Sequence, residues 1–259
     1  MILKEHSHCF MIHNIFAIDT HTHINHGAPH DSEMIENITD ATLEHILEMA
    51  KAAKIDKMFC STFSSVCANT EIPEENEYLE KLCSSLDCMY QWVVMEPRVD
   101  MTFSQAERIL KTQKCVGIKL HPGLHNYTLK DYGDKLADFA DSFDTTLLIH
   151  GGGDEELLRL ANEHPRLRFI LPHVATVGDV DICARSKHGN VYLDTSGIGS
   201  VRNNVIEYAV KRCGSERILF GTDTYAAGFQ RGRIEYAMIS DKDKENILRY
   251  NAERLFDIK

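Results

Sequence analysis

Fourteen histidines are an unusual number for a chain of 259 residues, and two of them form the pattern His21-Thr22-His23. Alternate residues of a β-strand point to the same side, so a strand with this pattern would aim both imidazoles at one point. Further polar side chains follow short apolar runs elsewhere in the chain: Lys119, His121, His150, His173 and Asp223. These residue types at strand ends indicate a metal site.

Four of these residues form the donor set that we expect to hold a metal ion: His21, His23, His150 and Asp223. Imidazole nitrogens with a carboxylate oxygen suit zinc, and manganese, iron or cobalt are alternatives. Such an ion lowers the pKa of a coordinated water to about 7 and can polarise a carbonyl group. A lone histidine is usually an ordinary core or surface residue, but two at strand spacing beside other polar strand ends favour metal-assisted chemistry.

The metal site requires strands that bring these residues together. Apolar runs rich in β-branched and aromatic residues predict eight strands, at 15–18, 57–60, 92–95, 116–120, 146–149, 167–171, 191–193 and 217–220. Between them, helical spacing of apolar residues predicts helices at 38–53, 78–86, 104–110, 136–143, 155–161, 177–184, 205–210 and 244–256. Strands that alternate with helices are typical of parallel sheets with right-handed crossovers.

Eight such units in 259 residues predict the α/β fold class, as a single (β/α)8 TIM barrel. The competing fold, a doubly wound open sheet, often carries Gly-x-Gly-x-x-Gly, which this sequence lacks. No linker-like stretch divides the chain, so we expect one domain over 1–259, with 1–13 as a short extension. In such barrels catalytic residues lie at the C-terminal ends of the strands, which is where the histidines and Asp223 fall.

The composition narrows the class of protein. A hydrophobic fraction of 43% with 26% charged residues describes an ordinary globular chain. The net charge of −11 disfavours a nucleic-acid partner, and no apolar stretch is long enough to span a membrane. Charged and histidine residues interrupt any signal-peptide core, and the eight cysteines are scattered without a Cys-x-x-Cys pair. We therefore expect a cytoplasmic protein that acts on a small molecule.

Six motifs along the chain resemble those of the amidohydrolase superfamily. They are Ile18-Asp-Thr-His-Thr-His23, Gly117-Ile-Lys-Leu-His-Pro122, Leu148-Ile-His-Gly151, Leu171-Pro-His-Val174, Leu219-Phe-Gly-Thr-Asp223 and Asn251-Ala-Glu-Arg-Leu-Phe256. The His-x-His pattern with the final Asp is specific for the superfamily. The closing helix motif resembles the amidohydrolase-related branch, which includes aminocarboxymuconate semialdehyde decarboxylase and the resorcylate decarboxylases.

The resemblance implies a role for each matching residue. His21, His23 and His150 would bind the metal, and Asp223 would both bind it and accept a proton from the attacking water. His173 would either bind a second metal or orient and deprotonate that water. One ion is more expected than two, and the resemblance also allows a homo-oligomer.

Lys119 has three interpretations: a carboxylated bridge between two metal ions, a contact to an anionic substrate, or a structural residue in a salt bridge. His121 faces the same side of the predicted strand and is a candidate for a substrate contact or a further ligand. Arg98 could hold a substrate carboxylate bidentately or be a surface arginine. Tyr225 and Arg202 follow the last two strands and are further candidates for substrate contacts.

Two reactions fit this site. The leading hypothesis is metal-dependent hydrolysis of an amide, lactone or related C–N or C–O bond, with Asp223 and His173 handling protons. The alternative is metal-dependent, non-oxidative decarboxylation of an unsaturated or aromatic carboxylic acid. Carboxylation of Lys119 with two metals would favour hydrolysis, whereas one metal beside arginines would favour decarboxylation.

Other functions and segments fit less well. A TatD-like deoxyribonuclease usually carries Gly-Glu-x-Gly-Leu-Asp on strand four, where this chain has Gly117-Ile-Lys-Leu-His121. A non-catalytic barrel is disfavoured because the ligand set is complete. We expect His6-Ser-His8 in the extension to bind nothing catalytic, and the polar segment 64–76 to form a rim loop or partial lid.

Overall fold

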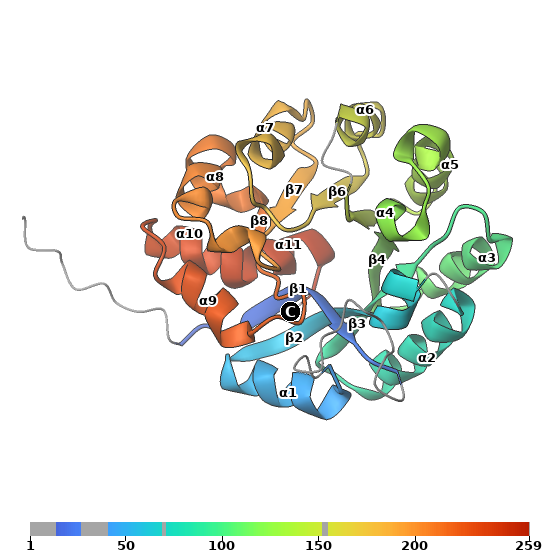
Figure 1. Cartoon of the computed structure of the whole chain (residues 1–259), viewed down its shortest axis with the longest axis horizontal. Coiled ribbons are helices and arrows are strands. Elements are labelled where there is room, and N and C mark those ends of the chain that lie inside the picture. Colours follow the sequence, from blue (N-terminus) through green and yellow to red (C-terminus); the bar gives the residue numbers. More distant parts are fainter. Residues whose placement is uncertain (1–13, 27–40, 69–70, 152–154, 259) are drawn as a thin grey trace, which may run out of the picture.

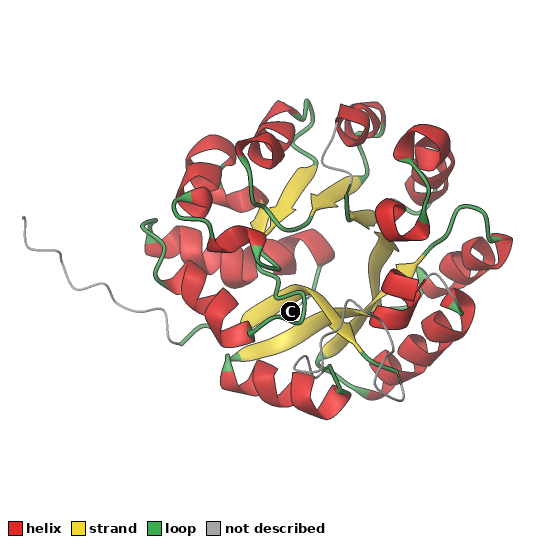
Figure 2. Cartoon of the chain, in the orientation of Figure 1, coloured by secondary structure: helices red, strands yellow, loops and turns green. Residues whose placement is uncertain are grey.

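A single ring of eight parallel strands forms the centre of the molecule, in the order β1 to β8. The computed structural model describes residues 14–26, 41–68, 71–151 and 155–258, so the predicted extension 1–13 with His6 and His8 lies outside the described residues. Backbone hydrogen bonds bring the first and last strands together: Thr20 N donates to Phe220 O at 2.9 Å and Thr222 N donates to His21 O at 3.1 Å. Figures 1 and 2 show the helices surrounding this ring. The predicted (β/α)8 TIM barrel is confirmed.

Each predicted strand corresponds to an observed one. The strands are β1 (Ala17–Ile24), β2 (Ile55–Thr62), β3 (Met89–Val94), β4 (Cys115–Leu120), β5 (Thr146–Ile149), β6 (Arg168–Leu171), β7 (Val191–Asp194) and β8 (Ile218–Leu219). The largest difference is in β1, whose prediction ended at residue 18. The strand continues through both histidines because its β-branched threonines favour extended backbone and every side chain in it is buried against a partner.

The helices and short helical turns alternate with the strands. They are α1 (Leu43–Ala52), η1 (Ser64–Ala68), α2 (Ile72–Ser85), α3 (Asp100–Ile109), α4 (Pro122–His125), α5 (Leu129–Asp141), α6 (Glu155–Glu163), α7 (Val177–Arg185), η2 (Gly199–Val201), α8 (Val205–Cys213), η3 (Ser215–Arg217), α9 (Ala227–Glu235), α10 (Asp241–Glu245), η4 (Asn246–Tyr250) and α11 (Asn251–Phe256). Among these described helices, none is long and apolar enough to cross a membrane.

Of the two alternatives for the segment 64–76, a rim loop or a partial lid, the loop is wrong because the described residues are mostly helical, and the lid stays a prediction. Residues Ser64–Ala68 form a turn of π-helix, and α2 already begins at Ile72 with Pro73 in its first turn. Proline is favoured there because its missing N–H would have no partner in the helix. The predicted helix at 244–256 is divided among α10, η4 and α11, and α4 and α9 were not predicted.

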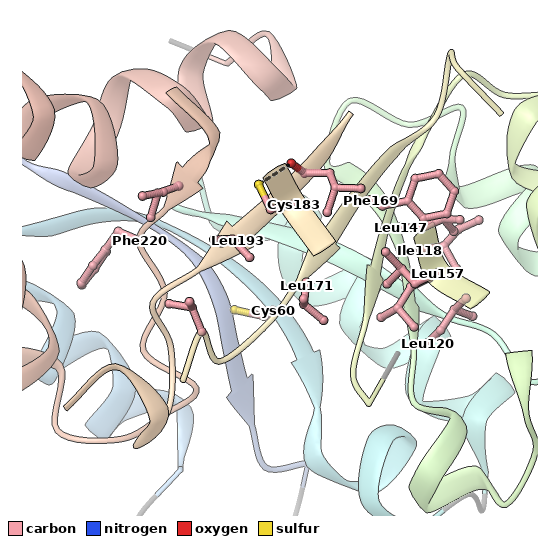
Figure 3. Close-up of a cluster of buried hydrophobic side chains, with 14 of the residues drawn as sticks. Cys60, Ile118, Leu120, Leu147, Leu157, Phe169, Leu171, Cys183, Leu193 and Phe220 are labelled. Atoms are coloured by element: carbon pink, nitrogen blue, oxygen red, sulfur yellow. Dashed lines mark hydrogen bonds between the residues drawn. The ribbon is translucent and has the colours of Figure 1, made fainter. Parts of the chain in front are cut away.

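Two apolar layers hold the barrel and define which way its side chains point. Ile118 and Leu120 of β4 belong to the large core between strands and helices, together with Leu147 and Phe169 (Figure 3). The alternating side chains Leu148 and Ile170 belong to a second cluster inside the barrel, toward the amino ends of its strands, together with Trp92 and Phe59. Phe256 of α11 packs beneath them, with its ring 4.8 Å from that of Phe59.

Candidate metal centre

An irregularity in β1 turns its two histidines toward the barrel interior. Ile18 packs inside the barrel, and strict alternation from it would send His21 and His23 outward. However, Asp19 pairs with Met58 and Thr22 with Cys60, so β1 advances three residues while β2 advances two. Such a β-bulge reverses the side on which the following residues point. Both imidazoles therefore face the interior at the carboxyl end of the strands.

His21, His23 and Asp223 offer ligand atoms that all lie within 4.8 Å of one another. Asp223 Oδ1 is 3.1 Å from His23 Nε2 and 3.6 Å from His21 Nε2. Both histidines are buried, and the Asp223 side chain is 18% exposed, so solvent reaches the group from the side of Asp223. The structure thus assembles three of the four residues that we expected to bind metal.

His150, the fourth expected ligand, reaches the same rim but lies outside that group. Its ring centroid is 4.1 Å from that of His121 and 4.6 Å from that of His173. The His173 ring in turn stacks on His21 with a centroid distance of 5.0 Å. The His173 ring therefore lies between His150 and His21, and the role of His150 as a ligand stays a prediction.

Backbone geometry holds Asp223 against β1. Asp223 and Thr224 have φ values of 55° and 67°, a left-handed conformation that costs such residues about 1–3 kcal/mol each. Hydrogen bonds to β1 stabilise this turn: Asp223 N donates to His21 O at 2.7 Å, and Thr224 Oγ1 donates to His23 O at 2.9 Å. The carboxylate and the two imidazoles are consequently positioned by the same contact between strands.

Asp19 fixes the turn from the outer side of the strand. Its carboxylate accepts hydrogen bonds from Thr222 Oγ1 at 2.6 Å, Thr222 N at 3.0 Å and His21 N at 3.1 Å. Burial raises the pKa of Asp19 to about 7, although these hydrogen bonds act in the opposite direction. We therefore assign Asp19 a structural role beneath the donor group.

The protonation states fit a divalent cation. Burial, together with the nearby Lys119, lowers the pKa of His21 to about 3, and burial lowers the pKa of His23. Burial opposes ionisation of Asp223, but the hydrogen bond from His23 and the neighbouring histidines hold its pKa well below the usual range. Because metals bind neutral imidazole and ionised carboxylate, the group presents its donors in the required form.

Lys119 lies directly beside this group. Its side chain is fully buried inside the barrel, and its Nζ is 2.8 Å from His21 Nε2. Burial lowers the pKa of Lys119 to about 8, while Asp223 and Asp194 act in the opposite direction. The amine is thus mainly protonated at pH 7 and is the charged group nearest to the expected metal ligands.

His121 follows β4 and His173 lies just after β6, so the two histidines are at the ends of the strands on either side of β5. His121 caps α4, because its Nδ1 accepts a hydrogen bond from Leu124 N at 3.1 Å. His173 has a φ of 60°, and its Nε2 is 3.8 Å from Asp223 Oδ2. Both imidazoles therefore reach the rim of the barrel, where His173 faces the donor group directly.

Arg98, Tyr225 and Arg202 are the remaining candidates from the sequence. Arg98 forms a bidentate pair with Glu96, with Nε to Oε1 at 2.7 Å and NH2 to Oε2 at 2.9 Å, and it also donates to the carbonyls of His125 and Asn126. Tyr225 is 47% exposed in the turn after Asp223. Arg202 lines a separate cavity of about 310 Å³ between α7 and α8.

Three residues that contact the histidines were missed by the sequence analysis. Ser61 Oγ is 2.9 Å from His23 Nδ1, and Asp194 Oδ2 is 2.9 Å from His21 Nδ1. Ser196 lies between His21 and His173. Asp194 comes directly after the predicted strand 191–193, the same signal that selected His121 and His150, whereas Ser61 and Ser196 have no signal of their own.

A (β/α)8 barrel with paired histidines on its first strand and an aspartate after its last defines the class of amidohydrolase-like TIM barrels. Residues 18–258 match the family model described as Amidohydrolase, and the chain belongs to this family. No curated protein is significantly similar to it.

Several solved structures share the fold. A 2,6-dihydroxybenzoate decarboxylase from Rhizobium has 17% sequence identity and a TM-score of 0.73, with 93% of this chain and 98% of that chain covered. A 5-carboxyvanillate decarboxylase from Sphingomonas paucimobilis has 14% identity and a TM-score of 0.73, with 94% and 99% covered. A 5-carboxyvanillate decarboxylase from Novosphingobium aromaticivorans, complexed with manganese, has 15% identity and a TM-score of 0.73, with 95% and 97% covered. At these identities the likeness shows the fold alone.

Proposed function

We propose that this protein is a divalent-metal-dependent decarboxylase that removes CO2 from an aromatic or unsaturated carboxylic acid. The observation that carries the proposal is the buried amine of Lys119, 2.8 Å from His21 Nε2 beside the donor group. A protonated amine next to a metal site offers an anionic carboxylate two positive partners. The similar structures described as decarboxylases support the same choice, which places decarboxylation ahead of hydrolysis.

The chain's own residues suggest how the reaction proceeds. His21, His23 and Asp223 would hold the ion, with His150 as the further ligand that the resemblance implies. When bound, a divalent ion, zinc or manganese, supplies Lewis acidity that polarises a substrate oxygen. Lys119 binds and orients the substrate carboxylate within the buried interior.

As the bond between the carbon and the carboxylate breaks, its electron pair stays on the substrate carbon, which must then take up a proton. Asp223 and His173 are the pair through which we expect that proton to pass, because His173 Nε2 and Asp223 Oδ2 face each other at 3.8 Å, a separation that an intervening water would bridge. His121 and Tyr225 are the rim residues that we expect to contact the rest of the substrate. Arg98 forms an ion pair with Glu96, so we expect it to contribute less to substrate binding.

Hydrolysis of an amide or lactone is the second candidate. It is favoured by the positions of Lys119 and His173. A carboxylated Lys119 would add a ligand beside His21 for the first ion, and His150 and His173 would be available for a second ion. His150 and His173 adjoin each other there, with ring centroids 4.6 Å apart. Two ions and a carboxylated lysine would then replace one ion and a free amine.

Product analysis separates the two reactions. The chain would be treated with a chelator, reloaded with Mn²⁺ or Zn²⁺, and incubated with 2,6-dihydroxybenzoate and 5-carboxyvanillate, and in parallel with simple amides and lactones. Release of CO2 that depends on the metal supports decarboxylation. Hydrolysis without CO2 release supports the second candidate, and a metal-loaded chain that does neither contradicts both.

We also propose that the enzyme works in the cytoplasm on a small molecule as a single domain. The cysteines that the structure describes are free thiols, and this fits a reducing compartment. The negative net charge fits a small-molecule substrate better than a nucleic acid.

A further inference from the structure

We propose that Asp194 and Ser196 are positioning residues that hold His21 and His173 in the same tautomer, with the proton on Nδ1 and the lone pair on Nε2. The proposal rests on the metal-dependent function, because both Nε2 atoms face the group around Asp223. It assigns a role to the end of β7, which contributes no expected ligand.

Asp194 and Ser196 contact both imidazoles from behind. Asp194 Oδ2 is 2.9 Å from His21 Nδ1. Ser196 Oγ is 3.0 Å from His21 Nδ1 and 2.9 Å from His173 Nδ1, and it forms a short hydrogen bond with Asp194 Oδ1. Asp194 and Ser196 are fully buried, so water does not compete for these contacts.

The count of protons settles the direction of each hydrogen bond. Asp194 Oδ1 accepts from Ser196 N, His173 N and Ser196 Oγ, which is the environment of an ionised carboxylate, and such a group only accepts. His21 Nδ1 must therefore carry the proton that it shares with Asp194. Ser196 has one hydroxyl proton and gives it to Asp194 Oδ1, so its oxygen can only accept from His173 Nδ1–H. With the proton on Nε2 instead, His173 would present a lone pair to the lone pairs of Ser196.

The other side of each ring agrees with this assignment. His21 Nε2 lies 2.8 Å from Lys119 Nζ, and an amine N–H at this distance can donate to the bare Nε2 of a ring that is protonated on Nδ1. His173 Nε2 is 3.8 Å from Asp223 Oδ2, which is too long for a hydrogen bond that a proton on Nε2 would make. Both Nε2 atoms thus carry a lone pair and not a proton on the side of the ring that faces the donor group.

The same carboxylate also fixes the main chain of His173. Asp194 Oδ1 accepts from Ser196 N at 2.8 Å and from His173 N at 3.1 Å, and the second bond supports the left-handed φ of 60° at His173. Gly197 follows with a φ of 66°, and a Cβ there would lie 2.8 Å from His173 Nδ1. Only glycine therefore leaves the ring in place.

His21, His173 and Asp194 form a second group of potential metal ligands. The hydroxyl of Ser196 lies within hydrogen-bonding distance of all three side chains. Hydrogen bonds within the protein therefore satisfy this group. We infer that it orients the histidines that face the metal and does not form a second metal site.

Nitrogen NMR tests the tautomers directly. Long-range ¹H–¹⁵N spectra of the metal-free chain with labelled histidines, assigned with His21→Gln and His173→Gln, should show protonated Nδ1 and bare Nε2 for both rings at pH 7. In Ser196→Ala, His173 should lose this preference, whereas His21 should keep it through Asp194. Ser61→Ala is the matched control, because it removes a hydroxyl from His23 and should leave the other two rings unchanged.

Metal affinity tests the consequence. Outer-sphere partners of metal-binding histidines typically contribute 10–100-fold in affinity, so Asp194→Asn should weaken Mn²⁺ binding by about that factor, and Ser196→Ala by less. A proton on Nε2 of either ring in the wild type, or an unchanged His173 in Ser196→Ala, would overturn the proposal. If Asp194→Asn does not fold, the wild-type and Ser196→Ala spectra still decide. The spectra need neither metal nor substrate, so a failure of the decarboxylase proposal would be seen separately.

Discussion

The two sides of the barrel rim differ in how firmly their polar groups are held. On the metal side, formed by His21, His23 and Asp223, each imidazole nitrogen has a hydrogen-bonding partner at 2.8–3.1 Å. On the open side, formed by Lys119, His121 and His150, Lys119 contacts His21 and His121 accepts from Leu124 N, whereas the described side-chain contacts of His150 are ring contacts with His121 and His173. The metal side is thus preorganised for one task, whereas on the open side the His150 ring, whose described contacts are with other rings, can adapt to a substrate.

Removing a residue of the metal side should have the largest effect. We expect His21→Ala to lower metal affinity by more than the roughly 100-fold that outer-sphere partners contribute, and to abolish turnover. The barrel should stay folded, because the buried apolar layers do not depend on this ring. Elemental mass spectrometry after dialysis, with kinetics, measures both. His188→Ala, at an exposed histidine, is the control and should keep metal and activity. Full metal content in His21→Ala would remove the distinction between the two sides.

Removing the charge of the open side should affect substrate and not metal. Lys119→Met should keep one ion per chain and raise KM for a carboxylate substrate by about 10–100-fold, since a charged hydrogen bond contributes about 1.5–3 kcal/mol. Metal content and steady-state kinetics measured together check this. A fall from two ions to one would instead identify Lys119 as a carboxylated bridge.

Much of this arrangement follows from the sequence, and the exceptions have physical causes. Apolar runs locate the strands because each strand is buried on both faces, and polar residues at their ends mark the rim. The inward direction of His21 and His23 does not follow, because the bulge in β1 depends on pairing with β2. Likewise, Arg98, which pairs with Glu96 two residues away, meets the carbonyls of His125 and Asn126 only after distant segments come together. Local sequence carries no signal for such contacts.

Glu96 tests whether Arg98 supports the open side structurally. Glu96→Gln should lower the free energy of unfolding by about 1 kcal/mol at pH 7, with a smaller effect on KM than Lys119→Met, because Arg98 is partly exposed. Burial opposes ionisation of Glu96, but the hydrogen bonds from Arg98 outweigh it and keep its pKa below the usual 4.5. The stabilising difference should therefore be present above pH 4.5 and be lost as the pH falls below it. Urea unfolding of both proteins from pH 3 to 7 measures this, and a difference that is constant with pH would contradict it.

The smallest effect is expected at His121. His121→Asn retains a side-chain acceptor for Leu124 N, so stability should change by a few tenths of a kcal/mol, whereas His121→Ala should cost about 1 kcal/mol. If His121 contacts the substrate, both variants should raise KM equally. Thermal unfolding and kinetics separate the two roles, and an unchanged KM in both variants would restrict His121 to capping α4.

The metal content of the wild-type chain, purified without chelators and reconstituted with Mn²⁺ or Zn²⁺, tests the central claim most directly. Elemental mass spectrometry should find about one equivalent per chain, held by the metal side. About two equivalents would favour the hydrolase with a carboxylated Lys119. A chain that binds no ion even after reconstitution would contradict the assignment of His21, His23 and Asp223 as a metal centre.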